Sequence, residues 1–331
     1  MVKILYVERS PGPFISIEKV FREIADGLPE RFARSFQQMP YGWNVWGTIR
    51  NLLFFRPARA DIYHITGHVH YIALRLPPER TVLSIMDVRF ALLEKGLRRW
   101  VLKKLYLDWP LKRMRYVTTI SEQVRSEIVE LTGCDPDRIR VLDLPLLQHL
   151  QVTAEKPFEE GKPTILQVGT MANKNLPRLA EALNGIDCKL IVVGELAAEQ
   201  RESIELNGIE MENHVGVSDE KIRELYDLSD IVAFCSTYEG FGLPIIEAQA
   251  MRKPVVTSDI EPMRSVAGEG ACLVDPFSVE SIRRGVVSLI EDPERRRECV
   301  EAGQRNIERF RTTEVANQYA RLYDDVMAAL Q

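Results

Sequence analysis

The most constraining feature of this sequence is a short unit, residues 230–257, in which two apolar runs flank a glycine-rich turn and a helical segment. Residues 230–234 (DIVAF) and 253–257 (KPVVT) have the composition of buried strands. Between them, residues 239–242 (EGFG) form a turn before a helix that opens at Pro244. Two strands joined through a helix are parallel neighbours in a sheet, and the loop before the helix lies at its carboxyl edge. The unit therefore predicts an α/β fold.

Apolar runs alternate with helical patterns in two series, separated by a segment rich in charge, proline and glycine at 151–163. A chain of 331 residues exceeds one ordinary hydrophobic core, so we expect one domain for each series. Further strands are expected at 2–8, 61–66, 81–86, 115–120, 139–142, 164–168, 188–193, 209–213 and 271–274. Helices are expected at 15–27, 94–109, 121–132, 175–184, 218–228, 278–291, 293–310 and 312–330.

This pattern predicts two doubly wound, Rossmann-like parallel-sheet domains that face each other across a cleft, where strand ends and ligands gather. We expect the first domain to comprise residues 1–155 and the second residues 156–311. Residues 312–331 are predicted to form a C-terminal helix that packs back on the first domain.

Charge is distributed unevenly along the chain. Residues 1–155 hold 23 Lys and Arg against 17 Asp and Glu, whereas the remaining residues hold 20 against 31. An acidic second half argues against a nucleic-acid-binding protein, while the basic first half is compatible with an anionic partner.

The sequence also indicates in which cellular compartment the protein resides. No apolar run approaches the length of about 18 residues that a membrane span needs. The start, residues 1–7 (MVKILYV), has the pattern of a buried strand and is too short for a signal peptide. The five cysteines are widely spaced and form no CxxC pair, which is typical of reduced core residues. We therefore expect a cytoplasmic protein.

Two carboxylates, Glu239 and Glu247, stand eight positions apart near the start of the predicted helix. Unpaired N–H groups and the dipole make a helix N-terminus attractive to anions. An ionised carboxylate accepts hydrogen bonds from hydroxyl groups, so the pair suits a phosphate flanked by hydroxyls. On spacing alone, a capping carboxylate and a solvated helix position would fit equally.

Residues 239–248 (EGFGLPIIEA) resemble the E-x7-E signature of the retaining, nucleotide-sugar-dependent glycosyltransferases of family 4 (group 1), which have the two-domain GT-B fold. Further matches occur in the order that the family shows, and they cover most of the chain. They are Val168-Gly169-Thr170 with Lys174-Asn175-Leu176, Leu225-Tyr226 with Ser229-Asp230, Val274-Asp275-Pro276 and, more weakly, Thr118 to Glu122.

The resemblance implies a metal-independent hexosyltransferase of polysaccharide biosynthesis that needs no cofactor. Its substrates would be a nucleoside diphosphate sugar and a glycan or lipid-linked acceptor. In the family, the first glutamate holds donor-sugar hydroxyls, the second holds the ribose diol, and the lysine neutralises the diphosphate. Glu239 and Lys174 are thus predicted to be catalytic. The predicted donor-binding residues are Gly12, Gly169, Thr170, Lys174, Glu239, Gly240, Phe241, Gly242, Leu243 and Glu247.

The sequence departs from the family pattern at three positions. Many relatives carry an arginine just after the glycine or just before the lysine, where this chain has Thr170 and Asn173. Relatives commonly have His-Asp after the strand at 81–86, where this chain has Met86-Asp87. Two other interpretations follow: a non-catalytic nucleotide-sugar-binding or transferase-partner protein, and a same-fold enzyme resembling phosphorylase or sucrose synthase.

Three histidines gather in residues 61–71 (DIYHITGHVHY) of the first domain. Of these, His68 and His70, with Asp87, are predicted to line the acceptor side. Structural histidines and a metal site are the alternatives, and we expect no metal because the spacing suits ligation poorly. Asp135-Pro136-Asp137 has the form of a D-x-D metal motif but also of an ordinary turn, which we favour.

Residues 95–115 contain eight basic side chains among Trp100, Leu102, Leu105, Tyr106 and Trp109. One interpretation is an amphipathic surface helix whose apolar side faces the core. The other is an interfacial helix that binds anionic lipid peripherally at the inner face of the membrane, as a lipid-linked acceptor would require.

Overall fold

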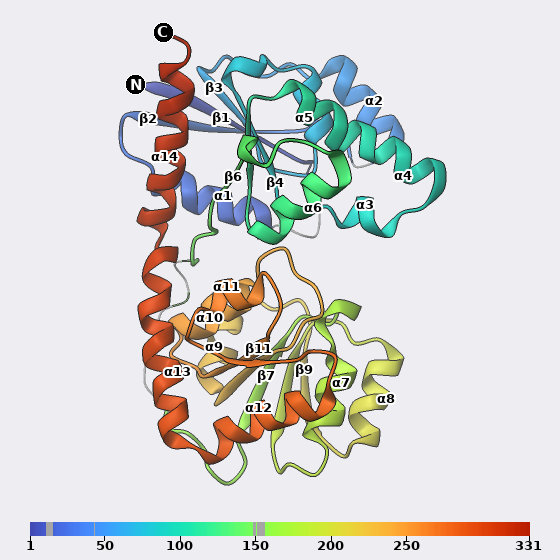
Figure 1. Ribbon diagram of the computed structural model, residues 1–331, viewed down its shortest axis with the longest axis vertical. Coiled ribbons are helices and arrows are strands. Elements are labelled where there is room, and N and C mark those ends of the chain that lie inside the picture. The colour runs from blue at the N-terminus through green and yellow to red at the C-terminus, as the bar shows by residue number, and fades with distance from the viewer. Residues whose placement is uncertain (11–15, 43, 148–149, 151–155) are drawn as a thin grey trace. The chain divides into compact units, whose positions relative to one another are not determined.

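The computed structural model divides the chain into two compact units, which are described separately (Figure 1). The first unit consists of Met1–Pro145 together with Thr312–Gln331, and the second of Leu146–Arg311. Each contains a six-stranded parallel sheet with helices on its faces, which confirms the two predicted doubly wound domains. The structure describes residues 1–10, 16–42, 44–147, 150 and 156–331.

In the first unit the strand order is β2-β1-β3-β4-β5-β6. Because β1 lies between β2 and β3, the connections leave it in opposite directions, and its carboxyl end is a switch point of the sheet. The strands are β1 (Val2–Glu8), β2 (Phe32–Gln38), β3 (Ile62–Ile65), β4 (Thr81–Ile85), β5 (Tyr116–Thr119) and β6 (Ile139–Val141).

The helices of this unit include α14 from the far end of the chain, which packs against α1. The helix α6 begins and ends as predicted, since Ser121 Oγ accepts a hydrogen bond from Val124 N and Gly133 ends the helix in the left-handed region. The helices are α1 (Ser16–Asp26), α2 (Val45–Phe54), α3 (Arg89–Leu93), α4 (Gly96–Lys103), a π-helical turn (Lys104–Asp108), α5 (Trp109–Arg113), α6 (Glu122–Thr132) and α14 (Thr312–Ala328).

A buried polar network joins α14 to the sheet of the first unit. His64 on β3 is hydrogen bonded through Nδ1 to Tyr323 Oη of α14 and through Nε2 to Ser84 Oγ of β4, both at 2.7 Å. Tyr6 Oη of β1 lies 3.1 Å from the same tyrosine oxygen. Because a buried polar group costs free energy unless it is paired, this network favours one docking position of the helix.

In the second unit the strand order is β12-β11-β10-β7-β8-β9. The strands are β7 (Thr164–Val168), β8 (Lys189–Val193), β9 (Glu210–His214), β10 (Ile231–Phe234), β11 (Val255–Ser258) and β12 (Cys272–Val274). The helices are α7 (Leu176–Leu183), α8 (Ala198–Leu206), α9 (Asp219–Leu228), α10 (Leu243–Ala250), α11 (Met263–Ala267), α12 (Val279–Glu291) and α13 (Pro293–Asn306).

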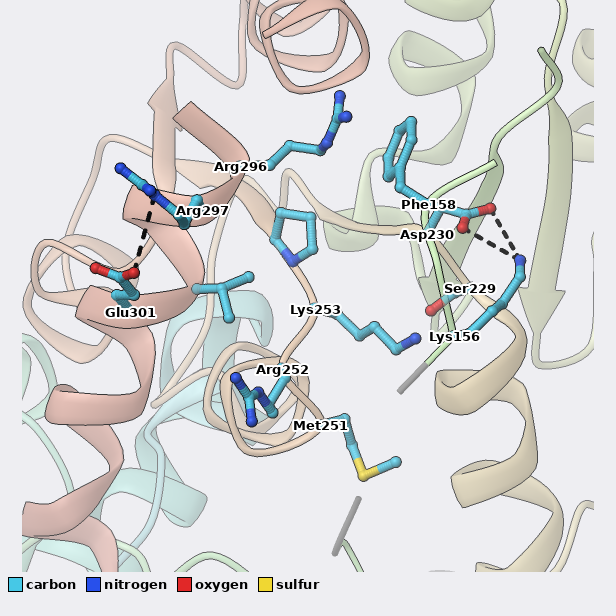
Figure 2. A pocket seen from close by; sticks show the side chains of 12 residues that line it. Lys156, Phe158, Ser229, Asp230, Met251, Arg252, Lys253, Arg296, Arg297 and Glu301 are labelled. Carbon is cyan, nitrogen blue, oxygen red and sulfur yellow. Dashed lines mark hydrogen bonds and ion pairs between the residues drawn. The ribbon is translucent and has the colours of Figure 1, made fainter. Parts of the chain in front are cut away.

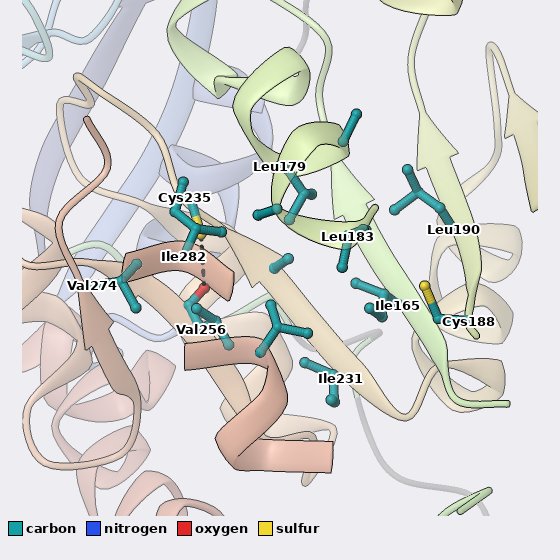
Figure 3. Close-up of a cluster of buried hydrophobic side chains, with 14 of the residues drawn as sticks. Ile165, Leu179, Leu183, Cys188, Leu190, Ile231, Cys235, Val256, Val274 and Ile282 are labelled. Carbon is teal, nitrogen blue, oxygen red and sulfur yellow. Dashed lines mark hydrogen bonds between the residues drawn. The ribbon is translucent and has the colours of Figure 1, made fainter. Parts of the chain in front are cut away.

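An apolar cluster of the second unit lies between its sheet and the helices α7 and α12 (Figure 3). Leu179 and Leu183 of α7 and Ile282 of α12 point toward Ile165 of β7 and Val256 of β11, and all five side chains are fully buried. Removing such side chains from water stabilises the fold by roughly 2 kcal/mol each. This core supports the strand ends on which the candidate site is built.

Several elements were not expected from the sequence, namely the strand β2 and the helices α2, α3, α5, α8 and α11. The strand β2 lies at the edge of its sheet, and several of its residues are exposed, so it lacks the apolar run that marks a central strand. The helices α2 and α8 were also missed; α2 leaves much of its apolar surface exposed, and α8 buries only Gln200 and Ile204. Hydrophobic periodicity gives little signal for elements of this kind.

Candidate functional site

The topology of the second sheet fixes where its loops converge. From β7 the chain continues to β8 on one side, whereas β10 lies on the other side of β7. The loops after β7 and β10 therefore meet at the carboxyl edge, at the point where the connections diverge. In doubly wound sheets this switch point is where ligands bind.

Lys174 and Glu239 come together at this edge. The loop after β7 carries Lys174, whose Nζ lies 2.8 Å from Glu239 Oε1 in the loop after β10. Asn173 Nδ2 donates to the same carboxylate oxygen at 3.1 Å and to the carbonyl of Tyr238 at 2.8 Å. The Lys174 ammonium also lies 4.5 Å from the centre of the Phe234 ring. The two loops are thus joined by a cation, an amide and a carboxylate.

Glycine is required at two positions of these loops. Gly169 has φ of +91°, and a Cβ there would lie 2.8 Å from Cε of Lys174, so a larger residue would displace the lysine. Gly242 has φ of +111° and precedes α10, and among the described residues no side chain caps the first turn of that helix. Pro244 has no N–H and Ile245 N donates to the Gly242 carbonyl oxygen at 3.0 Å, so the Leu243 N–H is the group at the start of α10 that can bind an anion.

Glu247 lies in α10 and is held by a tyrosine of the preceding helix. Tyr226 Oη of α9 donates a hydrogen bond to Glu247 Oε2 at 2.7 Å. Burial raises the pKa of the Glu247 carboxyl, while the Tyr226 hydrogen bond and the Lys174 charge oppose that rise. Burial and the neighbouring Glu247 charge hold the pKa of Tyr226 well above its usual range, so its hydroxyl remains a donor.

The other predicted donor-site residues occupy the same loops in different ways. Thr170 Oγ1 donates a hydrogen bond to the carbonyl oxygen of Glu195 at 2.6 Å, which ties the loop after β7 to the loop after β8. Phe241 is buried and packs edge-on against Phe310, so it supports the turn from within. Gly240 lies in the turn before Phe241, and Leu243 is the first residue of α10. Gly12 lies outside the described residues.

The acceptor-side residues predicted in the first unit differ in burial. His68 Nε2 lies 3.4 Å from Asp87 Oδ2, and both side chains are partly exposed beyond the ends of β3 and β4. The pKa of His68 is lowered, mainly by burial, while the charge of Asp87 opposes this shift. The His70 ring stacks on that of His68, but it is buried and its Nδ1 lies 2.9 Å from the Tyr106 carbonyl oxygen.

His64 and His70 are therefore buried in contacts within the protein, whereas His68 and Asp87, of the residues predicted for the acceptor side, are partly exposed. Within the described parts of the chain, no three metal-ligating side chains of the His, Cys, Asp or Glu type lie together. The Asp135-Pro136-Asp137 sequence forms a turn, as expected, in which Asp135 Oδ1 accepts a hydrogen bond from Asp137 N.

A separate hollow of about 430 Å³ lies where β10 and β11 begin, at the opposite edge of the second sheet (Figure 2). Its charged groups are already engaged within the protein. Lys156 Nζ binds the Asp230 carboxylate at 3.1 Å, and the Arg296 guanidinium lies 3.7 Å from the centre of the Phe158 ring. These contacts fasten the segment that precedes β7, and none of the predicted site residues lines this hollow.

The fold and the charged loops at the carboxyl edge of the second sheet are chemically suited to an anionic, hydroxyl-rich ligand. Comparison with known sequences identifies the class, because residues 151–306 match the family described as glycosyl transferases group 1. O-antigen chain mannosyltransferase B of Escherichia coli is 28% identical over 295 residues, which cover 78% of this chain and 74% of that protein.

Two further proteins extend the comparison. Phosphatidyl-myo-inositol mannosyltransferase of Mycobacterium leprae is 27% identical over 223 residues, or 62% of this chain and 58% of that protein. Among solved structures, Anabaena HepE in complex with UDP-glucose has a TM-score of 0.77 at 17% identity and covers 98% of this chain and 100% of its own. The structural likeness shows the two-domain GT-B fold.

The match to the group 1 glycosyltransferases covers the second unit, and the Escherichia coli mannosyltransferase extends the similarity into the first. The protein is a retaining glycosyltransferase that uses a nucleotide sugar, as the sequence resemblance implied.

Two residues with contacts at this site were not assigned a role from the sequence. Asn173 was noted only as standing where relatives carry an arginine, yet its amide donates to Glu239. Tyr226 was recognised only as part of a matching motif, yet its hydroxyl holds Glu247. The sequence signal for Asn173 was its position next to Lys174, and the signal for Tyr226 was its place in a motif that matches the family.

Proposed function

We propose that this enzyme transfers a mannosyl group from a nucleoside diphosphate mannose to a hydroxyl of a glycan or lipid-linked acceptor in bacterial surface polysaccharide synthesis. The choice of sugar and acceptor is supported by the O-antigen mannosyltransferase and the phosphatidyl-myo-inositol mannosyltransferase to which the chain is similar. The donor is assigned to the second unit and the acceptor to the first, where His68 and Asp87 would contact it.

One observation carries the donor assignment: Lys174, Glu239, Glu247 and the open N-terminus of α10 converge at the β7–β10 switch point. A lysine and a helix N-terminus suit the diphosphate, which gains negative charge as it leaves. Carboxylates suit the hydroxyls of the sugar and the ribose. Glu239 would bind the sugar and Glu247 the ribose.

The arrangement favours attack on the same face from which the phosphate leaves. The bond between the anomeric carbon and the phosphate oxygen breaks, and the acceptor oxygen bonds to that carbon with its configuration retained. The acceptor's proton passes to the departing phosphate. Glu239 is assigned to the hydroxyls of the donor sugar, so in this proposal it does not act as a covalent nucleophile. Mass spectrometric trapping of a glycosyl adduct on Glu239 would contradict this mechanism.

Product analysis tests the proposed transfer. With a mannosyl donor and a polysaccharide or lipid-linked acceptor, NMR should detect a product whose anomeric configuration matches that of the donor. Replacing the acceptor by inorganic phosphate should give no sugar phosphate. A sugar phosphate in that reaction would favour the phosphorylase-like alternative, and a product of inverted configuration would contradict the mechanism.

The mutation Lys174→Ala should lower kcat by about 100-fold to 1,000-fold, because a fixed cation stabilises the charge that develops on the leaving diphosphate. Lys189→Ala is a matched control. This lysine also pairs with a glutamate of the second unit, Glu212, but on β8 and β9, away from the switch-point loops. Steady-state kinetics of both variants should show the loss only in the first. Equal kcat values in wild type and Lys174→Ala would remove the lysine from the mechanism.

We also propose that α4 docks the first unit on an anionic membrane surface. None of the eight residues of α4 is buried, so its apolar side does not face the core; Leu97 is 76% and Trp100 56% exposed. Exposed apolar side chains beside the cations Arg98 and Arg99 suit an interfacial helix. No helix in the described parts of the chain is long and apolar enough to cross a membrane.

Liposome flotation tests this docking surface. The wild type should float with vesicles that contain acidic lipid and be released by salt, since the attraction is screened. The double variant Leu97→Ser/Trp100→Ser should lose most of this binding. Leu206→Ser, an exposed apolar residue on α8 of the second unit, serves as control. Absence of wild-type flotation at low salt would end the proposal.

A further inference from the structure

We propose that Tyr226 is a positioning residue of the donor site, whose hydroxyl holds one oxygen of the Glu247 carboxylate and leaves the other oxygen facing the ligand. This inference rests on the proposed function, because it concerns how the second glutamate is made ready to bind the donor. Nothing in the E-x7-E pattern itself requires a tyrosine on the preceding helix.

The two oxygens of Glu247 have different surroundings. Oε2 accepts the hydrogen bond from Tyr226 Oη at 2.7 Å, whereas Oε1 has no partner among the residues that the structure describes. The tyrosine is fully buried, and the glutamate is partly exposed. One oxygen is therefore anchored from within the protein, and the other is open to a hydroxyl group from outside.

The charged and titratable groups that act on Glu247 come from two elements. From α9 come Tyr226, which lowers the pKa of the carboxyl by donating a hydrogen bond, and Asp219, whose charge raises it. From the loop after β7 comes Lys174, whose charge lowers it. Lys174 is bonded directly to Glu239, so Tyr226 supplies the direct contact that offsets burial of Glu247.

The substitution Tyr226→Phe isolates the hydroxyl, because the ring keeps its place in the core. The end of α9 should also be preserved, since Ser229 Oγ donates to the Tyr226 carbonyl oxygen, which the substitution leaves unchanged. What is lost is the hydrogen bond from Tyr226 Oη to Glu247 Oε2. The carboxylate is then freer to rotate, and its pKa should rise further because burial is no longer offset by this bond.

Kinetics as a function of pH provide the first test. At neutral pH, Tyr226→Phe should raise KM for the donor about tenfold with little change in kcat, because the lost interaction orients the ground state and the transition state alike. The acid limb of kcat/KM should move to higher pH, because Glu247 is protonated earlier as pH falls.

Two control variants separate positioning from a structural role. In the Glu247→Gln background the side chain does not titrate, so adding Tyr226→Phe should leave the acid limb where Glu247→Gln alone has it. Tyr71→Phe removes another buried contact, between Tyr71 Oη and Asn51 Nδ2, in the first unit and should leave the acid limb at the wild-type position. A shift of that limb in Tyr71→Phe, or the same shift in the glutamine background, would overturn the proposal.

Direct titration of Glu247 by carboxyl ¹³C NMR, assigned by its absence in Glu247→Gln, decides the matter without turnover. A higher midpoint in Tyr226→Phe than in wild type supports the proposal, and an unchanged midpoint overturns it. If the midpoint moves but the wild type turns over no nucleotide sugar, the contact acts as inferred and the proposed function is what fails.

Discussion

Replacing Glu247 by alanine should lower kcat/KM for the nucleotide sugar by about 100-fold to 10,000-fold. The carboxylate is assigned two hydroxyl hydrogen bonds, and each bond to a charged group contributes about 1.5–3 kcal/mol. The same change leaves the buried Tyr226 hydroxyl without its acceptor, which adds to the loss of local order. Release of the nucleoside diphosphate, as donor hydrolysis without an acceptor, measures the effect.

A matched surface variant shows whether this loss is specific. Glu202→Ala removes an exposed glutamate from α8 of the same unit, and it should retain wild-type donor hydrolysis. Thermal melting of both variants checks that they are folded. Donor hydrolysis by Glu247→Ala at the wild-type rate would show that this glutamate does not bind the donor.

Acidification should destabilise the first unit strongly. Burial lowers the pKa of His64 and of His70 to about 3, from the ordinary 6.5. The unfolded chain therefore takes up protons below about pH 6.5 while the folded unit does not, so stability is lost as the pH falls from 6.5 toward 3. At pH 5 each histidine should account for a loss of about 2 kcal/mol in the free energy of unfolding.

Denaturant unfolding at pH 7 and pH 5 measures this effect. All four tryptophans, at positions 43, 46, 100 and 109, lie in the first unit, so their fluorescence reports its unfolding. The variant His70→Asn keeps a donor for the Tyr106 carbonyl oxygen but does not titrate. It should lose about 2 kcal/mol less than wild type between the two pH values. An equal loss in both proteins would show that His70 is not the source.

The overall fold follows from the sequence because each central strand is a short apolar run and most are followed by an amphipathic helix. That pattern places β7, β10 and β11 in parallel sheets without knowledge of contacts. The edge strand β2 and the polar helix α8 could not be predicted in this way, because neither has a continuous apolar face.

The sequence predicted the residues of the candidate site that belong to recognisable motifs, but not the contacts around them. Glu239, Glu247 and Lys174 stand in recognisable patterns, but the contacts around them depend on which loops and helices become neighbours. Asn173 reaches Glu239 only because β7 and β10 are adjacent. His70 was assigned to the acceptor side, but its side chain is buried and lies within hydrogen-bonding distance of the Tyr106 carbonyl oxygen, 36 residues away. Spacing within the sequence carries no information about such partners.

Calorimetric titration with nucleotide sugars tests the central claim most directly, namely that the loops at the β7–β10 switch point form the donor site. We expect at least one of the UDP-, GDP- or ADP-sugars to bind the wild type. Binding should be lost in Glu247→Ala and retained in Glu202→Ala. Failure of every nucleotide sugar to bind the wild type, or equal affinity for wild type and Glu247→Ala, would contradict this account.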